Sequence, residues 1–168
     1  MLYRVRCMKT FDPDRTKDPY FRIDRPGDAN CMLGRALREA EHALFSPFSK
    51  DYACIEDFDL SVDRIAQQTG HAKTVIRSGI LAYNRLTDLP RLRDLQDAHM
   101  RLSLGLLRAI HRKIDELGPE VDTDLLVDID AYLVKLFTPT KQNQPFPDPA
   151  AVTRKLREEI RRIDPGLS

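Results

Sequence analysis

The chain has 168 residues, of which 42% are hydrophobic and 32% are charged, and its net charge is +1. This length and composition are typical of one globular domain with a charge-rich surface, or of one domain with a tail. No run approaches the ~20 apolar residues of a membrane span, and the N-terminus lacks the apolar centre of a signal peptide, so we expect a cytoplasmic protein with no membrane role.

The small net charge conceals segments of opposite sign. Residues 1–27 carry +3, residues 28–70 carry −4, residues 71–112 carry +5 and residues 113–168 carry −3. A concentrated basic block favours an anionic partner at a local patch. The alternative is that arginine-rich helices are simply well solvated.

The first part of the chain is expected to form an irregular arm followed by one helix. Prolines and aspartates interrupt residues 1–27. Apolar residues then recur at helical spacing over Asp28–Phe45. This spacing predicts a helix whose buried face includes Leu37 and whose Arg35 and Arg38 lie outside that face.

A helix-turn-helix is predicted for Ser61–Leu86, after a connector at Tyr52–Leu60. Gly70 stands where the chain needs a sharp turn between two short helices, because glycine adopts left-handed backbone angles without strain. Apolar residues on both sides of the turn recur at three- and four-residue steps, the spacing of buried helix faces. These residues are Ile65, Ala66, Val75, Ile76, Ile80 and Tyr83.

Polar and basic side chains are concentrated at the start of the second of these helices. In a helix-turn-helix this position faces the DNA major groove, where Lys and Arg reach guanine edges or phosphates. The residues that we expect to face the groove are Lys73, Thr74, Arg77 and Ser78. The residues that we expect to contact phosphates are Arg85, Arg91, Arg93 and Arg101. Alternatively, these eight residues form a solvated face.

Four further helices are predicted after this unit. Pro90 suits the first turn of one helix, Ser103 caps a second, Asp122 begins a third and Asp148 caps the last. Residues 139–148 are polar and rich in proline and are expected to be a linker. The last helix carries an apolar stripe that is a candidate surface for a homodimer. The stripe consists of Val152, Leu156, Ile160 and Ile163.

The sequence contains no catalytic, nucleotide-binding or metal-binding motif. It lacks the glycine-rich phosphate loops and the H-E-x-x-H pattern, and its four histidines are far apart. Cys7, Cys31 and Cys54 are too widely spaced for a zinc pattern and are expected to be free thiols. We therefore expect no cofactor and no metal, and an enzymatic activity has no support within the chain.

The order of the central elements resembles a known family of helical domains. The helix-turn-helix is followed by the pattern L-x-x-L-P-x-L-x-x-L, a short turn and S-x-x-x-x-R-A-I. This order is similar to the actinobacterial domain of unknown function DUF 222, the 13E12-type family, over residues 30–165. The segments that match are RIAQQTGHAKTVIRSGILAYNRL, LPRLRDLQDAHMRLSLGLLRAI and AVTRKLREEIRRIDP.

The resemblance implies a role beside a nuclease. In that family the domain commonly precedes a C-terminal HNH endonuclease domain, whose metal site generates the nucleophile. No such site follows residue 165, so this chain would be the accessory, DNA-binding or DNA-positioning part without the nuclease. The family often has a glycine after the L-P helix, where this chain has Ala98 and His99.

A weaker similarity links the same central segment to the helix-turn-helix core of the partition protein ParB. There too an L-P helix follows the helix-turn-helix, and a serine begins the next short helix. This chain lacks the arginine-rich nucleotide-binding box of ParB.

We therefore predict an all-α fold, an irregular bundle of six or seven helices containing a helix-turn-helix-like unit. Its parts are an arm at 1–27, a helical domain at 28–138, the linker at 139–148 and a C-terminal helix at 149–168. Two functions follow from the sequence. One is DNA binding, and the other is a protein-interaction or dimerisation module with no nucleic-acid role.

Overall fold

The computed structural model describes residues 21–22, 30–47, 55–140 and 144–166. Within these ranges the chain forms seven α-helices, short 3-10 segments and one parallel pair of two-residue strands. The α-helices are α2 (Met32–Phe45), α3 (Ile55–Thr69), α4 (Lys73–Asn84), α5 (Pro90–His99), α6 (Leu104–Asp115), α7 (Thr123–Leu136) and α8 (Pro149–Ile163). The remaining elements are η3 (Arg85–Asp88), β1 (Phe21–Arg22) and β2 (Asn30–Cys31). The predicted all-α multi-helix bundle is confirmed.

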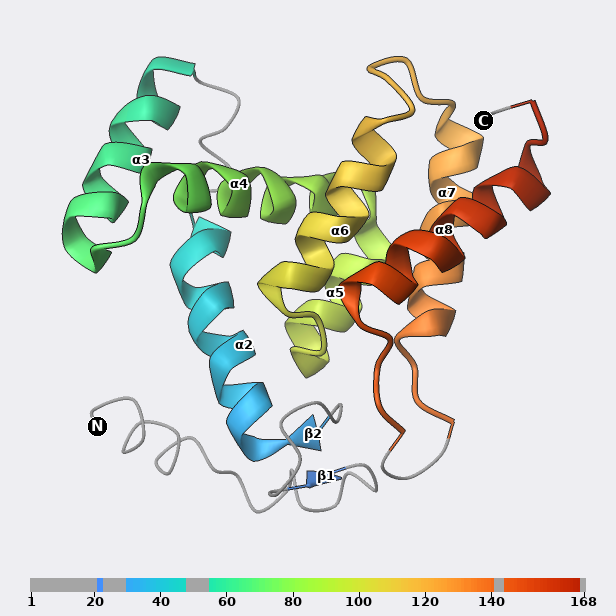
Figure 1. The fold of residues 1–168 in the computed structure, drawn as a ribbon, viewed down its shortest axis with the longest axis horizontal. Helices are drawn as coiled ribbons and strands as arrows, with labels where there is room; N and C mark the ends of the chain where they lie inside the picture. The colour runs from blue at the N-terminus through green and yellow to red at the C-terminus, as the bar shows by residue number, and fades with distance from the viewer. Residues whose placement is uncertain (1–20, 23–29, 48–54, 141–143, 167–168) are drawn as a thin grey trace.

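Helices α4 and α6 form the centre of the bundle. α4 packs against α2, α3 and α6, and α6 packs in turn against α8. Figure 1 shows α2 and α3 near the start of α4, and α5 to α8 gathered around its other end. The side chains shared by these contacts form one continuous apolar core, because each helix contributes a stripe at helical spacing. Its most deeply buried members include Ile65, Ile76, Ile80, Leu107, Ile110, Ile114, Ile129, Leu133 and Phe137.

Two helices begin at the capping residues that the sequence predicts. Ser103 Oγ accepts a hydrogen bond from the backbone N–H of Leu106 at 3.2 Å, at the start of α6. Asp148 Oδ1 accepts one from the N–H of Ala151 at 2.8 Å, at the start of α8. These side chains satisfy N–H groups that have no partner within their own helix.

Helix α5 is capped by a residue from another helix. Its N-cap position is occupied by Leu89, which has no polar side chain and is fully buried. Asp130 of α7, only 2% exposed, accepts hydrogen bonds from the backbone N–H groups of Arg91 at 3.0 Å and Leu92 at 2.9 Å. A buried helix start needs such acceptors, so Asp130 fixes α5 against α7.

Buried Gln96 holds the loop between α5 and α6. Its amide Nε2 donates to the Leu102 carbonyl at 2.9 Å, and its Oε1 accepts from the Leu102 N–H at 2.8 Å. Met100, which ends α5, has a left-handed backbone with φ 51°. The two hydrogen bonds satisfy the buried backbone N–H and C=O of Leu102, which lies outside any helix or strand.

Two expectations about the first helices are wrong. The connector expected at Tyr52–Leu60 is partly helical, since α3 already begins at Ile55. On α2, Arg35 and Arg38 are 7% and 6% exposed, whereas Leu37 is 51% exposed. Arg38 Nε donates to the Met100 carbonyl. Arginine can bury its aliphatic stem when its head finds an acceptor, so the packed face of α2 includes residues that periodicity assigns to the surface.

The expected dimer stripe on the last helix is buried within this chain. Val152 and Leu156 are 0% exposed and Ile160 is 3% exposed, where α8 packs against α6 and α7. These three residues therefore present no free surface to a second subunit, and Ile163 is partly buried. The homodimer stays a prediction, without this stripe as its surface.

Several expectations fall on residues outside the described ranges. They are the irregular arm at 1–27 apart from β1, the thiols of Cys7 and Cys54, and part of the linker at 139–148. Among the described helices, none combines the length and the apolar character that crossing a membrane requires.

Replacing Asp130 with alanine is expected to lower the free energy of unfolding by about 2–3 kcal/mol, because two buried N–H groups lose their acceptor. The measurement is urea unfolding followed by circular dichroism. The matched control is Asp128→Ala, an exposed position on the same helix, which is expected to change stability by less than about 0.5 kcal/mol. Equal losses in the two variants would contradict the capping role.

Candidate nucleic-acid interface

The two helices predicted around Gly70 are present as α3 and α4. Gly70 has φ +75°, and its N–H donates to the Ala66 carbonyl at 2.9 Å. The hydroxyl of Thr69 donates to the Ile65 carbonyl at 2.8 Å and accepts from the His71 N–H at 3.3 Å. Glycine suits the left-handed position after the end of α3, so the turn is set by local chemistry.

The start of α4 is exposed as expected, but its two cations already have partners. Lys73 Nζ lies 2.9 Å from Asp63 Oδ1, and Arg77 Nη1 lies 3.0 Å from Asp59 Oδ1. All four side chains are about half exposed. Thr74 is exposed as well, and Ser78 is partly buried. Two residues four apart on α4 thus pair with two residues four apart on α3.

These ion pairs change the local charge that a DNA molecule would meet. The segment of α3 carries a net charge of −3, and the segment of α4 carries +2. The sequence shows this acidic run, but periodicity alone does not reveal that its carboxylates face the basic residues of α4. Exposed pairs of this kind contribute only about 0–1 kcal/mol each, so a phosphate can displace them.

Arg85 forms a hydrogen bond and ion pairs with other residues of this chain. Its Nε donates to His111 Nδ1 at 3.1 Å, and its Nη1 and Nη2 lie 3.0 Å from Asp88 and 3.6 Å from Asp115. Burial, followed by the nearby charge of Arg85, lowers the pKa of His111. His111 is therefore a neutral acceptor with its proton on Nε2, and Arg85 is only 18% exposed.

The three remaining arginines of the predicted phosphate set lie apart from the start of α4. Arg91 and Arg93 are exposed on α5, and Arg93 Nε lies 4.0 Å from Asp94. Arg101 is 7% exposed and donates to the Phe137 carbonyl at 3.4 Å. The expectation that Arg101 points outward is wrong, because its guanidinium group donates a hydrogen bond to a buried carbonyl.

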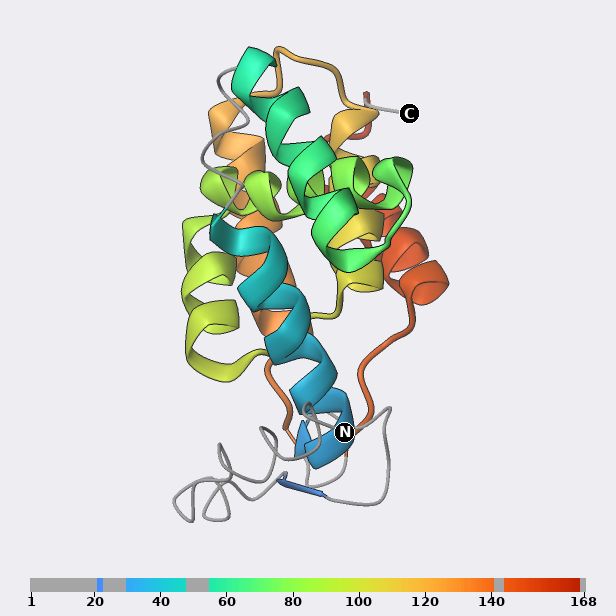
Figure 2. The same ribbon diagram turned by 90° about the vertical axis from the view of Figure 1, so that its left-hand side faces the viewer.

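The predicted set therefore does not form one patch. In Figure 2, α5 lies on the opposite side of the molecule from the start of α4. The structure brings Lys73, Thr74 and Arg77 together at that start and places Arg91 and Arg93 elsewhere. A single DNA contact through the helix-turn-helix can use the first group without the second.

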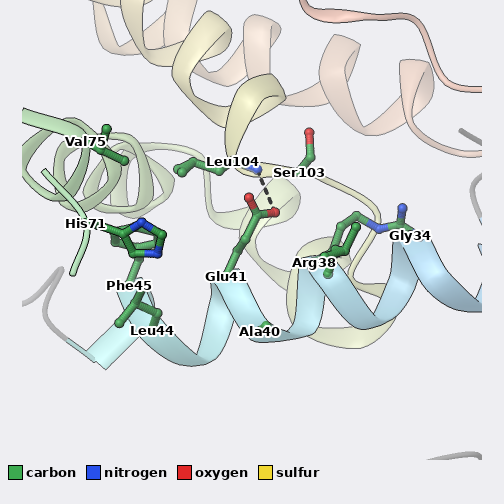
Figure 3. Close-up of a pocket in the computed structure, with 11 residues that line it drawn as sticks. Gly34, Arg38, Ala40, Glu41, Leu44, Phe45, His71, Val75, Ser103 and Leu104 are labelled. Atoms are coloured by element: carbon green, nitrogen blue, oxygen red, sulfur yellow. Dashed lines mark hydrogen bonds between the residues drawn. The ribbon is translucent and has the colours of Figure 1, made fainter. Parts of the chain in front are cut away.

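A groove that the sequence does not predict lies between α2, the start of α4 and the start of α6. It has a volume of about 540 Å³. Its walls include Leu37, Leu44, Phe45, Val75 and Leu104. Figure 3 shows Leu44, Phe45, Val75 and Leu104, which come from three separate helices, around one opening. The apolar residues of α2 that line it follow the same spacing as core residues, so the pattern alone assigns them to the core.

Glu41 is the carboxyl group at the centre of this groove. Its Oε1 accepts a hydrogen bond from the Leu104 N–H at 3.1 Å, drawn in Figure 3. Burial raises the pKa of Glu41, against the lowering effects of that hydrogen bond and of the charge on Arg38. The carboxyl group therefore joins α2 to the start of α6 at a cost in desolvation.

Gly79 brings α4 close to α2 at Phe45, one of the residues that line the groove. A Cβ at Gly79 would overlap the ring of Phe45, which is 3% exposed and stacks on Tyr83 with ring centroids 5.8 Å apart. The absence of a side chain therefore allows this approach.

Comparisons with known proteins give this chain no relatives. No protein-family model, no curated protein and no solved structure matches it. The resemblance to the DUF 222 family therefore stays a prediction. Among the described residues, no group of three or more His, Cys, Asp or Glu side chains is placed to hold a metal ion.

Gly79→Ala is expected to lower the free energy of unfolding by about 1–2 kcal/mol, since overpacking outweighs the gain in helix propensity. The control is Gly105→Ala on α6, where a Cβ would lie 3.5 Å from Pro149 Cγ, an ordinary contact. That variant is expected to gain about 0.5–1 kcal/mol. Chemical denaturation of both variants measures the difference, and a stabilised Gly79→Ala would disprove the close approach.

The raised pKa of Glu41 predicts a pH dependence of stability. The folded protein holds this proton more tightly than the unfolded chain does, so the contribution is present below about pH 4 and is lost as the pH rises through the folded pKa. Glu41→Gln keeps an acceptor for the Leu104 N–H and removes the charge. We expect its stability relative to the wild type to increase from pH 4 to pH 7, measured by urea unfolding.

The control for this pH series is Glu116→Gln. A hydrogen bond from Lys113, aided by nearby basic charges, lowers the pKa of Glu116, so its linkage has the opposite sign. Its relative stability is expected to decrease over the same pH range. The same trend in both variants would show that the effect reflects total charge and would rule out burial of Glu41 as its cause.

Proposed function

We propose that this protein binds duplex DNA and that the start of α4 contacts it. The observation that carries the proposal is the exposed first turn of α4, which the Gly70 turn sets off from α3 and which carries Lys73, Thr74 and Arg77. Lysine, threonine and arginine donate hydrogen bonds to phosphates and to base edges. The resemblance to domains that precede HNH nucleases supports an accessory role in positioning DNA.

The carboxylates of α3 hold the basic side chains of α4 and compete with DNA for them. Lys73 and Arg77 each face one aspartate, so DNA must either share or displace these partners. Since the pairs are half exposed, their loss costs at most about 1 kcal/mol each. This competition predicts opposite effects of neutralising the two sides of the ion pairs.

The test is fluorescence anisotropy with a random duplex at several salt concentrations. Lys73→Gln with Arg77→Gln is expected to weaken binding and to lower the salt slope by about 2, because two phosphate contacts are lost. Asp59→Asn with Asp63→Asn is expected to strengthen binding. The charge-matched control, Asp94→Asn with Asp128→Asn, alters exposed carboxylates on α5 and α7 and is expected to strengthen it less.

Two results would overturn this assignment. Absence of binding at low salt would remove the DNA role altogether. Equal strengthening by the two aspartate pairs would show that binding follows net charge and does not depend on the start of α4.

A protein-interaction role is the second candidate. The groove beside α2 favours it, because Leu37 and Val75 are 51% and 37% exposed on its walls. Apolar side chains exposed in a concave site are typical of surfaces that bind a partner. Under this alternative, Leu37→Ser would reduce complex formation, measured as a concentration-dependent mass, and salt would have little effect.

A further inference from the structure

Helices α6 and α8 form the most basic pair of packed helices in the described part of the chain. Their segments carry net charges of +2 and +3. They pack directly against each other through the core. None of the eight residues in the predicted DNA-binding set lies on either helix. This surface is therefore separate from the start of α4.

The arginines of α8 occupy one outward face. Arg154, Arg157 and Arg161 are all exposed and follow three- and four-residue steps. The apolar stripe of the same helix is buried against α6 and α7, so the arginines project on the side away from the core. Three guanidinium groups thus follow about two turns of one helix.

Arg112 of α6 extends this face onto the neighbouring helix. Glu116 just beyond α6 feels the charges of both Arg157 and Arg112, which lower its pKa in addition to the hydrogen bond from Lys113. Arg112 and Arg157 are both exposed, and the helices that carry them, α6 and α8, pack directly against each other. We use the name α6–α8 arginine face for Arg112, Arg154, Arg157 and Arg161.

The charges of this face are not neutralised by ion pairs. Within the described part of the chain, none of its four arginines has a carboxylate at salt-bridge distance. In contrast, Lys73, Arg77 and Arg85 each have one at 2.9 to 3.0 Å. Glu116 is paired with Lys113 at 2.9 Å. Glu158 is the acidic residue on the outer side of α8, adjacent to Arg157 in sequence. An arginine without a carboxylate partner is available to a phosphate.

The position of this face suits a ligand that also reaches α4. Figure 2 shows α8 and the start of α4 on the side away from α5, and Figure 1 shows them separated along the long axis of the molecule. A rigid, extended polyanion is the kind of ligand that can contact both places at once.

The composition of the face favours nucleic acid over a lipid surface. Helices that bind membrane interfaces present large apolar side chains beside their basic residues. The exposed large hydrophobic residues of the described chain lie on α2, α3, α4 and α7, and none lies on α6 or α8. Guanidinium groups without an apolar neighbour bind phosphates but do not insert into a bilayer.

We infer that the α6–α8 arginine face is a second DNA-contacting surface, which binds the phosphate backbone without reading base sequence. The inference rests on the proposed function, because it assigns a further surface to the same ligand. Arginine contacts to phosphates position a protein on DNA, whereas base contacts specify the sequence. The face would anchor the duplex while the start of α4 meets its groove.

The experiment compares two double variants that each remove two positive charges, one from the arginine face and one from a different site. Arg157→Gln with Arg161→Gln changes the arginine face. Lys135→Gln with Arg162→Gln changes the hollow between α7 and α8, which Lys135 of α7 and Arg162 of α8 both line. Anisotropy is measured with two duplexes of unrelated sequence over a range of salt, and circular dichroism confirms folding. Vesicles rich in anionic lipid form a parallel arm.

The arginine-face variant is expected to lower the salt slope by about 2 and to weaken binding equally for both duplexes. The control variant is expected to lower the slope by less than half as much. Equal losses in the two variants, or a loss confined to one duplex, would overturn the inference. Binding to vesicles with no binding to duplexes would overturn it as well.

The outcome for the start of α4 is separable from the outcome for this face. If Lys73→Gln with Arg77→Gln weakens binding and the arginine-face variant does not, the proposed function stands and this inference fails. If the reverse holds, the arginine face is the DNA contact and α4 is not. No binding by the wild-type protein refutes both.

Discussion

The structure depends on a carboxylate that caps a helix from a distance. The start of α5 lies in the core, where Leu89 cannot supply the acceptor that a helix N-terminus needs. Asp130 provides it for two N–H groups and thereby ties α5 to α7. The other end of α5 is held by Gln96, whose amide pairs with Leu102 and places the start of α6. Because α6 packs on both α4 and α8, these hydrogen bonds position the helices that carry both proposed DNA-contacting surfaces.

The distribution of ion pairs divides the basic residues into two groups with different availability. At the start of α4, Lys73 and Arg77 face carboxylates of α3, which fix their orientation and reduce the local positive charge. The four arginines of the α6–α8 arginine face have no such partner among the described residues, whereas Arg162 of α8 pairs with Glu159. A protein that binds DNA through both groups would combine two kinds of contact. At the groove, DNA would compete with the weakly held carboxylates of α3, whereas at the arginine face phosphates would bind without displacing a carboxylate. Both groups consist mainly of arginine and lysine. Their different roles would therefore follow from the presence or absence of a neighbouring carboxylate.

Much of the local structure could be predicted from the sequence, because its causes lie within a few residues. Ser103 and Asp148 cap the helices that follow them, and Gly70 adopts the left-handed angle of its turn. The same reasoning fails on α2, where Arg35 and Arg38 are buried and Leu37 is exposed. Helical periodicity identifies a face by residue type, but the burial of an arginine depends on an acceptor such as the Met100 carbonyl, 62 residues away.

The sequence by itself determined the helical class, most helix starts and the exposed basic turn of α4, since spacing, caps and turn residues act locally. Only the tertiary structure decided which charges are paired and which are free to bind a ligand. It turned Arg101 inward to a buried carbonyl, directed Asp59 and Asp63 toward α4, and left the arginines of α8 exposed. These outcomes depend on distances between helices that are remote in the chain. The spacing of residues along one helix does not predict which charged side chains pair across helices, because electrostatic and hydrogen-bond energies depend on separation in space.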